Sequence, residues 1–396
     1  MSTSALSNRN YRIYFAGSAI SLHGLWVYRV ALGWFTWELT GSEFWVGTVA
    51  FTQFAPAVVF GPIFGVLADR FDRRRASILI NVTSAANMAC LGLLALFSQV
   101  DIYVLVAQSL VQGALDGAHT PVRMTLLPNI VEKIQLQSAI ATTSISFNVS
   151  RFVGPAIAGL IIATLGVGAA FVVNGISYFA YIIALMMIEL RPSVARPDIP
   201  SNVWQEMLEG VRYVVSHRTI RGLLFIVAVT SVFGRGALEM MPAFADKIFD
   251  RGSSGLAILT ASIGVGAVST GLVLMRNTAW LNSRVIKISV VIAGVLIVVF
   301  GNIDSLWLAV PIVMGIGIIM SLCGVGSQIL IQTLVEDEVR GRVSSFWGMI
   351  AFGGTALGSL LIGTSAAVFG LQQTVIVSGL LCTAVALISP ISDSKE

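Results

Sequence analysis

Long apolar segments recur along almost the whole chain, and they restrict the fold more than any other feature. They lie at approximately 13–39, 44–68, 76–98, 102–123, 138–165, 168–190, 220–245, 254–276, 284–302, 304–330, 341–369 and 371–391. A helix of about 20 apolar residues is long enough to cross the hydrocarbon core of a bilayer. Only 11% of the residues are charged, whereas a soluble domain carries about 25%. We therefore predict an all-α membrane protein with twelve transmembrane helices in a lipid bilayer.

Basic residues mark one side of this predicted bundle. When the loops are assigned alternately to two sides, one side carries Arg9, Arg12 and the arginines of 70–75 and 191–221, whereas the other side has few basic residues. Cytoplasmic loops are enriched in Lys and Arg, so we expect both termini to be cytoplasmic. The first apolar segment lacks the pattern of a cleaved signal peptide and is expected to be a retained helix. Because the basic residues lie in loops, the net charge of +4 indicates topology and no nucleic-acid partner.

One long connection, from Arg191 to Arg221, divides the chain in two. It contains three prolines and then an expected short amphipathic helix at 203–215. We predict a six-helix bundle at 1–190, a cytoplasmic linker at 191–219 and a second six-helix bundle at 220–396. A faint internal repeat supports this division, because similar segments at 125–132 and 333–342 each precede a helix rich in Ser, Thr and Gly. Two halves of like topology place a substrate site between them, near the midplane of the membrane.

The most highly charged run joins the second and third apolar segments: Gly65-Val66-Leu67-Ala68-Asp69-Arg70-Phe71-Asp72-Arg73-Arg74-Arg75. One interpretation is a cytoplasmic anchor and nothing more. The details indicate more, because a glycine allows close helix approach and a helix N-terminus stabilises an acid. The run resembles the signature loop between helices 2 and 3 of the major facilitator superfamily. This resemblance implies a major facilitator fold with two pseudo-symmetric halves. It also implies a latch that joins the halves in one state, formed by Gly65, Asp69, Arg70, Arg73 and Arg74.

The fourth apolar segment carries a polar stripe. Its members are spaced by 4, 4, 3 and 4 residues, which places them on one helix face: Gln108, Gln112, Asp116, His119 and Arg123. An ionisable residue inside a membrane is costly and indicates function. Asp116 and His119 lie one turn apart and are our candidates for proton coupling. The alternative for His119 is a neutral, hydrogen-bonded residue that only fixes helix packing.

Polar residues also occur in the first, seventh and tenth segments. The candidates for a substrate cavity are Arg29, Arg235 and Gln328, together with Gln108 and Gln112, and Glu239 is a third candidate for proton coupling. Arg235 and Glu239 are four residues apart, so an ion pair that only fixes packing is the alternative for both. Segments 1, 4, 7 and 10 line the central cavity in the family. Trp26 and Trp34 either stack on a substrate beside Arg29 or belong to an interfacial aromatic belt.

The fifth segment contains Arg151 followed by Gly154-Pro155-Ala156-Ile157-Ala158-Gly159. Proline frees a carbonyl and permits a kink, and glycines allow close packing. The pattern resembles the Gly-Pro-x-x-Gly motif of proton-coupled exporters, with Gly154, Pro155 and Gly159 at its positions. Those exporters usually carry an arginine in helix 4, where this chain has Ser109. We therefore assign Arg151 to the substrate cavity and expect it to substitute for the missing arginine.

Motifs of enzymes and metal sites are missing from the sequence. It lacks a phosphate-binding Gly-x-x-x-x-Gly-Lys loop, His-Glu-x-x-His, Cys-x-x-Cys and Gly-x-Ser-x-Gly. We therefore expect no enzyme activity, no cofactor and no metal. Its three cysteines lie in apolar segments, as buried small hydrophobic residues do.

The segment Gln332-x-x-Val335-x-Asp337-Glu338-x-Arg340-Gly341-Arg342-Val343 resembles the subgroup of enterobactin and macrolide exporters. The resemblance implies a secondary active transporter of the bacterial cytoplasmic (inner) membrane that exports a small amphipathic molecule, such as a drug, macrolide or siderophore, in exchange for protons by alternating access. We expect a monomer. The alternatives are an importer or facilitator of a small organic anion and a lipid-handling transporter.

Overall fold

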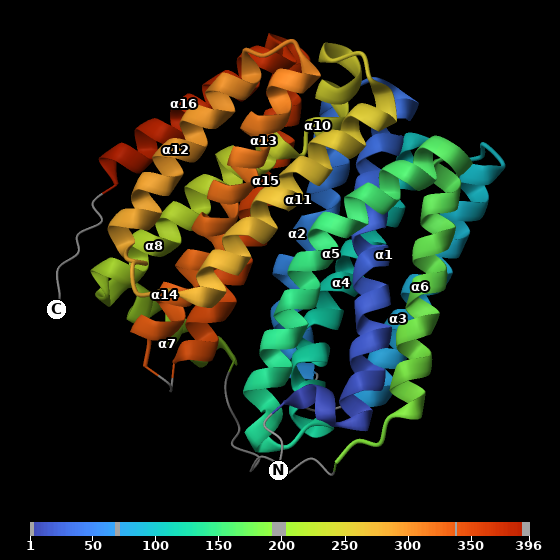
Figure 1. Cartoon of the computed structure of the whole chain (residues 1–396), viewed down its shortest axis with the longest axis vertical. Coiled ribbons are helices and arrows are strands. Elements are labelled where there is room, and N and C mark those ends of the chain that lie inside the picture. The colour runs from blue at the N-terminus through green and yellow to red at the C-terminus, as the bar shows by residue number, and fades with distance from the viewer. Residues whose placement is uncertain (1–3, 68–71, 192–202, 337–338, 390–396) are drawn as a thin grey trace.

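The computed structural model describes residues 4–67, 72–191, 203–336 and 339–389, and these residues form helices and connecting turns without a strand (Figure 1). The α-helices are α1 (Arg9–Thr40), α2 (Glu43–Leu67), α3 (Arg73–Leu96), α4 (Ile102–Ile130), α5 (Leu136–Leu165), α6 (Val167–Met187), α7 (Val203–Ser216), α8 (Arg218–Val229), α9 (Gly236–Leu238), α10 (Met241–Ala243), α11 (Gly252–Arg276), α12 (Ser283–Gly301), α13 (Leu306–Ser321), α14 (Ser327–Leu334), α15 (Arg340–Phe369) and α16 (Leu371–Ile388). Short 3₁₀-helices lie at η1 (Ala5–Ser7) and η2 (Lys133–Gln135). π-helices lie at η3 (Thr230–Arg235), η4 (Phe244–Ile248) and η5 (Leu322–Gly326).

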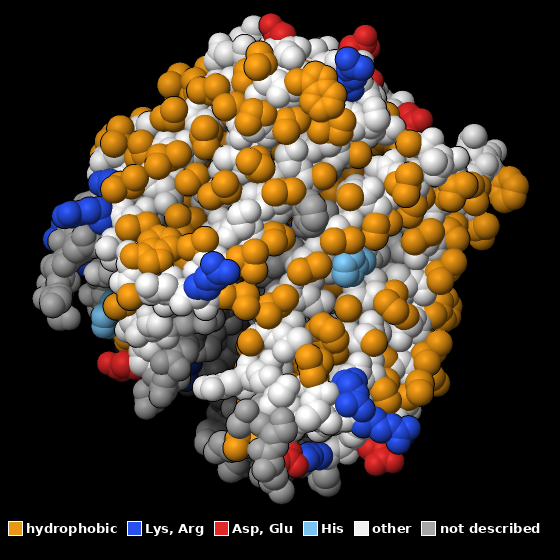
Figure 2. Space-filling model, viewed as in Figure 1, with side chains coloured by type: hydrophobic (Ala, Val, Ile, Leu, Met, Phe, Trp, Pro, Cys, Tyr) orange, Lys and Arg blue, Asp and Glu red, His pale blue; other side chains and the backbone are white. Residues whose placement is uncertain are grey.

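Ten helical segments of the described residues are long and apolar enough to cross a membrane. The two other long helices, α1 with 32 residues and α4 with 29 residues, contain most of the predicted polar stripe residues. At about 1.5 Å per residue both exceed the thickness of the hydrocarbon core. The described residues are therefore all-helical and long enough to span a membrane repeatedly, as predicted. Figure 2 shows apolar side chains over the middle of one face, with most charged side chains near the two ends of the molecule.

Helix ends coincide with residues that satisfy free backbone groups. Asn8, Asp101 and Asn282 accept a hydrogen bond from the backbone three residues later, at 3.3, 2.8 and 2.9 Å respectively, as N-caps do. Gly41 ends α1 with a φ of 56°, a left-handed conformation that glycine adopts without steric cost. These caps set the short connections that keep successive helices antiparallel.

The helices form two bundles, α1–α6 and α8–α16, with α7 against α15 (Figure 1). Contacts between the bundles come mainly from α2 with α15 and from α5 with α11. We call the end of the molecule that carries residues 4–8 and helix α7 the linker face, and the opposite end the far face. The expected amphipathic helix is observed as α7. Part of the predicted linker, 192–202, lies outside the described residues.

The seventh and tenth spans differ from the uniform helices that the sequence predicts. The segment 220–245 is wound as α8, η3, α9, α10 and η4, and the segment 304–330 as α13, η5 and α14. A π-turn inserts one residue into a helix and occurs frequently at functional sites. A π-turn does not change the polarity of the residues in the span, so hydropathy along the sequence does not reveal it. Helix α4 also continues to Ile130, past the predicted end at 123, with Pro121 and Pro128 inside it.

Candidate functional site

A hydrogen-bonded network surrounds Asp116 in the middle of α4. The Gln112 side chain is fully buried, and its Nε2 donates to Asp116 Oδ1 and to the Tyr178 hydroxyl, both at 3.0 Å. Its Oε1 accepts from Asn87 Nδ2 of α3 at 3.2 Å. The second carboxylate oxygen of Asp116, Oδ2, is buried without a protein partner. The network therefore holds the acid in one orientation and leaves one oxygen available for a proton or a ligand.

His119 lies one turn from Asp116 and has partners of its own. Its Nε2 is 3.2 Å from Asn81 Nδ2 of α3. Its ring meets the Tyr181 ring edge to face at 5.5 Å between centroids. An amide hydrogen bond and an edge-to-face ring contact fix the imidazole, which agrees with the packing alternative as well as with a role in the cavity.

Asp116 and His119 line one cavity of about 120 Å³. Its walls come from α1, α2, α4, α5 and α6, with Phe352 of α15 from the other bundle: Ser18, Ser21, Leu22, Leu25, Arg29, Gln53, Phe54, Ala57, Asp116, His119, Thr120, Arg123, Phe147, Tyr178, Tyr181 and Phe352. Phe54 and Phe352 stack across the boundary between the bundles at 6.4 Å. The cavity is therefore located where the halves meet.

Arg29 and Arg151 share the indole of Trp26. Their guanidinium carbons lie 4.8 and 5.2 Å from its ring centroid, and Arg29 is also 5.4 Å from the Phe54 ring. Such contacts stabilise a cation by about 0.5–2 kcal/mol, less than a buried ion pair provides. Among the described residues, neither arginine forms a salt bridge within 4 Å. Two cations therefore stand beside aromatic rings with their charges uncompensated by a direct carboxylate contact.

Arg235 ends the π-helix η3 and lies against the π-helix η5. A Cβ built on Gly324 would stand 2.6 Å from Arg235 Nη2, so the guanidinium occupies the space that a side chain at 324 would take. No salt bridge between Arg235 and Glu239 occurs among the described residues, which differs from the pairing alternative. Arg29 acts electrostatically on both Asp116 and Glu239, and Arg235 also acts on Glu239. Arg29 and Arg235 both act on Arg151, so the structure brings these three cations and two acids together.

The glycines of the α5 motif contact two different partners. A Cβ on Gly154 would lie 2.3 Å from the Trp26 Cβ of α1, and one on Gly159 would lie 2.0 Å from the Ala257 Cβ of α11. Pro155 is buried between them and leaves the Arg151 carbonyl without its usual helical donor. Gly154 thus allows α5 to pack closely on α1, and Gly159 allows α5 to pack closely on α11 of the other bundle.

The residues expected to form the latch are described only in part. Asp69 and Arg70 lie outside the described residues, and Gly65 is in the last turn of α2. Arg73 donates to Asn129 at 3.3 Å and Arg74 donates to the Met186 carbonyl. Both of these bonds stay within the α1–α6 bundle.

Three predicted cavity residues lie elsewhere. Gln108 lines a separate pocket between α3 and α4, Gln328 is half-buried on α14, and Trp34 packs near Gly252 at the far face. Conversely, sequence reasoning missed Tyr178 and Gln53, which line the cavity, and Asn87, which holds Gln112 of the network around Asp116. The available signal was a single polar group in an otherwise apolar helix, because such groups usually face the bundle interior.

The two bundles are closed together at the far face. Lys247 Nζ pairs with Glu43 at 2.7 Å, and Trp37 Nε1 donates to Asp246 at 2.8 Å. Each of these interactions joins one bundle to the other. One buried apolar cluster also spans both bundles there, from Phe35 of α1 to Phe244 and Leu259.

At the linker face each bundle has its own apolar cluster, around Tyr14 in one and around Leu223 in the other. The described ion pairs at this face, Arg191 with Glu132 and Arg342 with Glu209, do not join the two bundles. Figure 2 shows the surface hollowed between the bundles toward this end. In the part of the chain that the structure describes, the bundles are therefore closed at the far face and hollowed apart toward the linker face.

With the fold and the cavity established, comparison with known proteins identifies the family. The family model for a transmembrane secretion effector, one of the major facilitator models, matches residues 1–394. The chain belongs to this family. It is therefore a multi-pass membrane transporter and not an enzyme.

Curated relatives are similar over nearly their whole length. The staphyloferrin A transporter of Staphylococcus aureus is 26% identical over 381 residues, which cover 93% of this chain and 92% of the relative. The multidrug efflux pump Tap of Mycolicibacterium fortuitum is 26% identical, with coverage of 87% and 86%. The enterobactin exporter EntS of Escherichia coli is 21% identical, with coverage of 89% and 84%. Relatives of this chain therefore include efflux proteins.

A solved structure supports the fold independently. A bacterial homologue of the lysosomal transporter Spinster, in an inward-facing and unoccupied conformation, matches with a TM-score of 0.75 at 14% identity. The match covers 96% of this chain and 95% of that one. At this identity the likeness concerns the fold alone.

Proposed function

We propose that the protein exports a small amphipathic molecule with a polar or anionic group, in exchange for protons, across the bacterial inner membrane. The observation that carries this proposal is the cavity between the halves. There a buried acid, Asp116, has one oxygen without a partner, and Arg29 stands nearby without a salt bridge. A cavity with a protonatable acid and an uncompensated cation can bind a proton and an anionic group alternately.

The proposed exchange depends on the carboxylate of Asp116 and on the guanidinium groups near it. With Asp116 ionised, its free Oδ2 accepts a hydrogen bond from a polar donor group of the ligand, while Arg29, Arg151 and Arg235 attract the anionic or polar atoms of the ligand. When a proton binds Oδ2, this acceptor is lost and the ligand binds less tightly, so the proton and the ligand occupy the site alternately. Trp26 and Phe54, which already contact guanidinium groups, offer apolar faces to the rest of an amphipathic molecule. Glu239 is a second candidate for proton binding, because it is under the influence of the same Arg29.

The proposed topology has both termini in the cytoplasm, in keeping with the positive-inside distribution. The linker face is then cytoplasmic, and the state described above faces inward. Rocking of the two six-helix halves would move the opening to the far face. One charge that crosses 100 mV provides about 2.3 kcal/mol, enough for a roughly 50-fold concentration ratio of the transported molecule.

The test is a pH measurement in proteoliposomes that contain a pH-sensitive dye. We expect macrolides, siderophores or dyes to include a molecule that causes proton movement in the wild-type protein. Asp116→Asn, which keeps the acceptor for Gln112 but cannot exchange a proton, should abolish this movement. Glu38→Gln serves as the control, because Glu38 is an exposed carboxylate on α1 outside the cavity. Full proton coupling in Asp116→Asn would refute the role of Asp116.

The three arginines favour a second candidate, import or facilitated movement of a small organic anion. This function would show as flux of small anions such as dicarboxylates in the same vesicles, with no response to amphipathic molecules. Loss of that flux in Arg29→Gln, without a change in protein abundance, would support it. The names of two relatives, a multidrug efflux pump and an enterobactin exporter, support export as the first candidate.

A further inference from the structure

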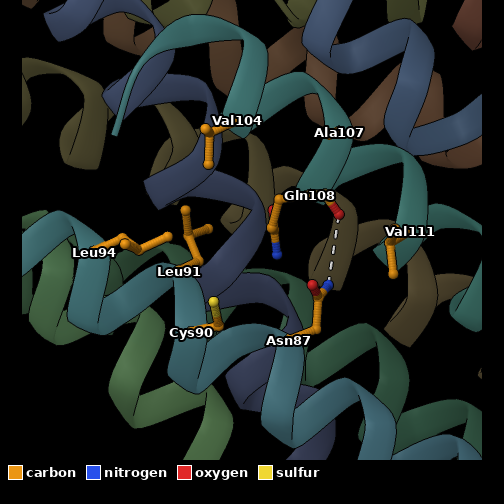
Figure 3. A pocket seen from close by; sticks show the side chains of 8 residues that line it. All are labelled: Asn87, Cys90, Leu91, Leu94, Val104, Ala107, Gln108 and Val111. Atoms are coloured by element: carbon orange, nitrogen blue, oxygen red, sulfur yellow. Dashed lines mark hydrogen bonds between the residues drawn. The ribbon is translucent and has the colours of Figure 1, made fainter. Parts of the chain in front are cut away.

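A second pocket lies between α3 and α4, apart from the central cavity. It has a volume of about 270 Å³ (Figure 3). Its walls are Asn87, Cys90, Leu91, Leu94, Val104, Ala107, Gln108 and Val111. Cys90 is exposed and Val111 is 47% exposed. In a helix that crosses the membrane such side chains face lipid, so this pocket opens sideways into the bilayer rather than toward the other bundle.

The unusual member of this wall is Gln108. Its side chain is 92% buried, as the residue is only 8% exposed, and neither Nε2 nor Oε1 has a hydrogen-bond partner in the protein. In Figure 3 the amide points into the space between Leu91, Cys90 and Asn87. A buried polar group without a partner costs about 1–3 kcal/mol. The Gln108 amide therefore has a donor group and an acceptor group that are both unpaired in the protein, and a bound ligand could pair with both.

The neighbouring polar group does not complete it. Asn87 Nδ2 donates to the Gln108 backbone carbonyl at 3.5 Å and to Gln112 Oε1 at 3.2 Å. Asn87 is thus committed to the backbone of α4 and to the network around Asp116. The side-chain amide of Gln108 remains available to a molecule that enters the pocket.

The depth and charge of the pocket restrict what that molecule can be. Tyr103, five residues before Gln108, is 71% exposed and meets the Trp45 ring edge to face, as expected of residues in an interfacial aromatic belt. Gln108 therefore lies about 7–8 Å deeper by helix rise. The eight lining residues include no Lys, Arg, Asp or Glu, so a charged phosphate head at this depth would be left uncompensated.

We propose that this pocket binds a long-chain fatty acid in its uncharged, protonated form. The acyl chain would lie along Leu91, Leu94 and Val111. The carboxylic acid would donate its O–H to Gln108 Oε1 and accept a hydrogen bond from Nε2 at its carbonyl oxygen. A primary amide and a carboxylic acid have matched donor–acceptor pairs, so both unpartnered atoms are satisfied at once. The proposal does not depend on the transported substrate.

Cys90 provides the assay, because it lines the pocket and is the exposed cysteine, whereas Cys323 and Cys382 are buried. The rate of its alkylation by a membrane-permeable maleimide is measured in nanodiscs of defined phospholipid, with palmitic acid or methyl palmitate added. Cys90→Ser gives the background. We expect palmitic acid to slow labelling. The methyl ester lacks the O–H donor, so about a tenfold higher concentration of it should be needed for the same protection. This factor corresponds to one hydrogen bond of about 1.4 kcal/mol.

Two variants separate the head-group contact from the pocket itself. Gln108→Leu should remove the difference between acid and ester, while Gln99→Leu, an exposed change outside the pocket, should retain it. Val111→Trp should fill the mouth and abolish protection by both molecules. Equal protection by acid and ester in the wild-type protein would overturn the role of Gln108. Stronger protection by monopalmitoylglycerol than by the acid would overturn the fatty-acid assignment, and absence of protection by all three would overturn the site.

Discussion

The ion pair between Lys247 and Glu43 offers the sharpest test of the far-face closure. It joins the two bundles at 2.7 Å, with Glu43 only 6% exposed and Lys247 51% exposed. If the bundles separate at this face, both groups become hydrated and the pair is lost. Lys247→Met should therefore leave Glu43 buried without its cation in the closed state but not in the open state.

The magnitude follows from the burial of the two partners. Exposed ion pairs contribute about 0.2–1 kcal/mol, and loss of one partner of a fully buried pair costs about 3–5 kcal/mol. A buried carboxylate beside a half-exposed amine lies between these limits, so we expect a penalty of about 1.5–2 kcal/mol. This shifts the ratio of far-face-open to far-face-closed molecules by about 10–30-fold.

Spin labels measure this shift directly. Cysteines replace Gln99 and Asn302, two exposed residues at the far ends of opposite bundles, in a Cys90→Ser background. Pulsed electron paramagnetic resonance then gives the distance distribution, which should gain a longer component in Lys247→Met. Glu132→Gln is the control, because the Glu132–Arg191 pair lies within the elements of one bundle. A distribution for Lys247→Met that matches the control would refute the assignment of this pair as a far-face closure.

Three further variants test packing and polarity elsewhere. Gly159→Ala would place a Cβ 2.0 Å from that of Ala257 and should also lengthen the far-face distance, whereas Gly271→Ala, which meets nothing within 4 Å, should not. Gly324→Ala should displace the Arg235 guanidinium and raise the KM of transport severalfold, while Gly348→Ala, which also meets nothing, leaves it unchanged. Gln112→Leu removes the partner of Asn87, Asp116 and Tyr178 and should destabilise the protein by about 2 kcal/mol, seen as a lower Tm in detergent than that of Gln99→Leu.

Much of the fold followed from apolar periodicity. The length of each apolar run predicted a spanning helix, and the stripe from Gln112 to Arg123 predicted that α4 faces the interior, as its partners Tyr178 and Asn81 show. These predictions succeed because exclusion of polar groups from lipid acts on every residue of a span. The local winding of η3 and η5 was not predictable, since a π-turn changes backbone hydrogen bonds without a change in residue polarity.

The site was predictable in its residue types more than in its partners. Asp116, Arg29 and Arg235 stood out because an ionisable group in a membrane is rare. Gln108 shares their helix face in projection but faces α3, because spacing alone does not tell which neighbour covers each turn of a stripe. Arg235 and Glu239 interact electrostatically but form no direct salt bridge among the described residues. Their spacing alone could not predict this, because Arg235 lies against η5, which is distant in the sequence.

The π-helices also give the two bundles different mechanical properties. The first and fourth spans, α1 and α4, contain no π-helix, whereas the seventh contains η3 and η4 and the tenth contains η5. One inserted residue turns the rest of a helix by about 100° and marks a point where bending is easy. The second bundle therefore contains three compliant joints, and η3, one of them, carries Arg235. Strain imposed at either end of the molecule would concentrate at these joints. It would change the direction in which the Arg235 side chain points before it displaced Asp116.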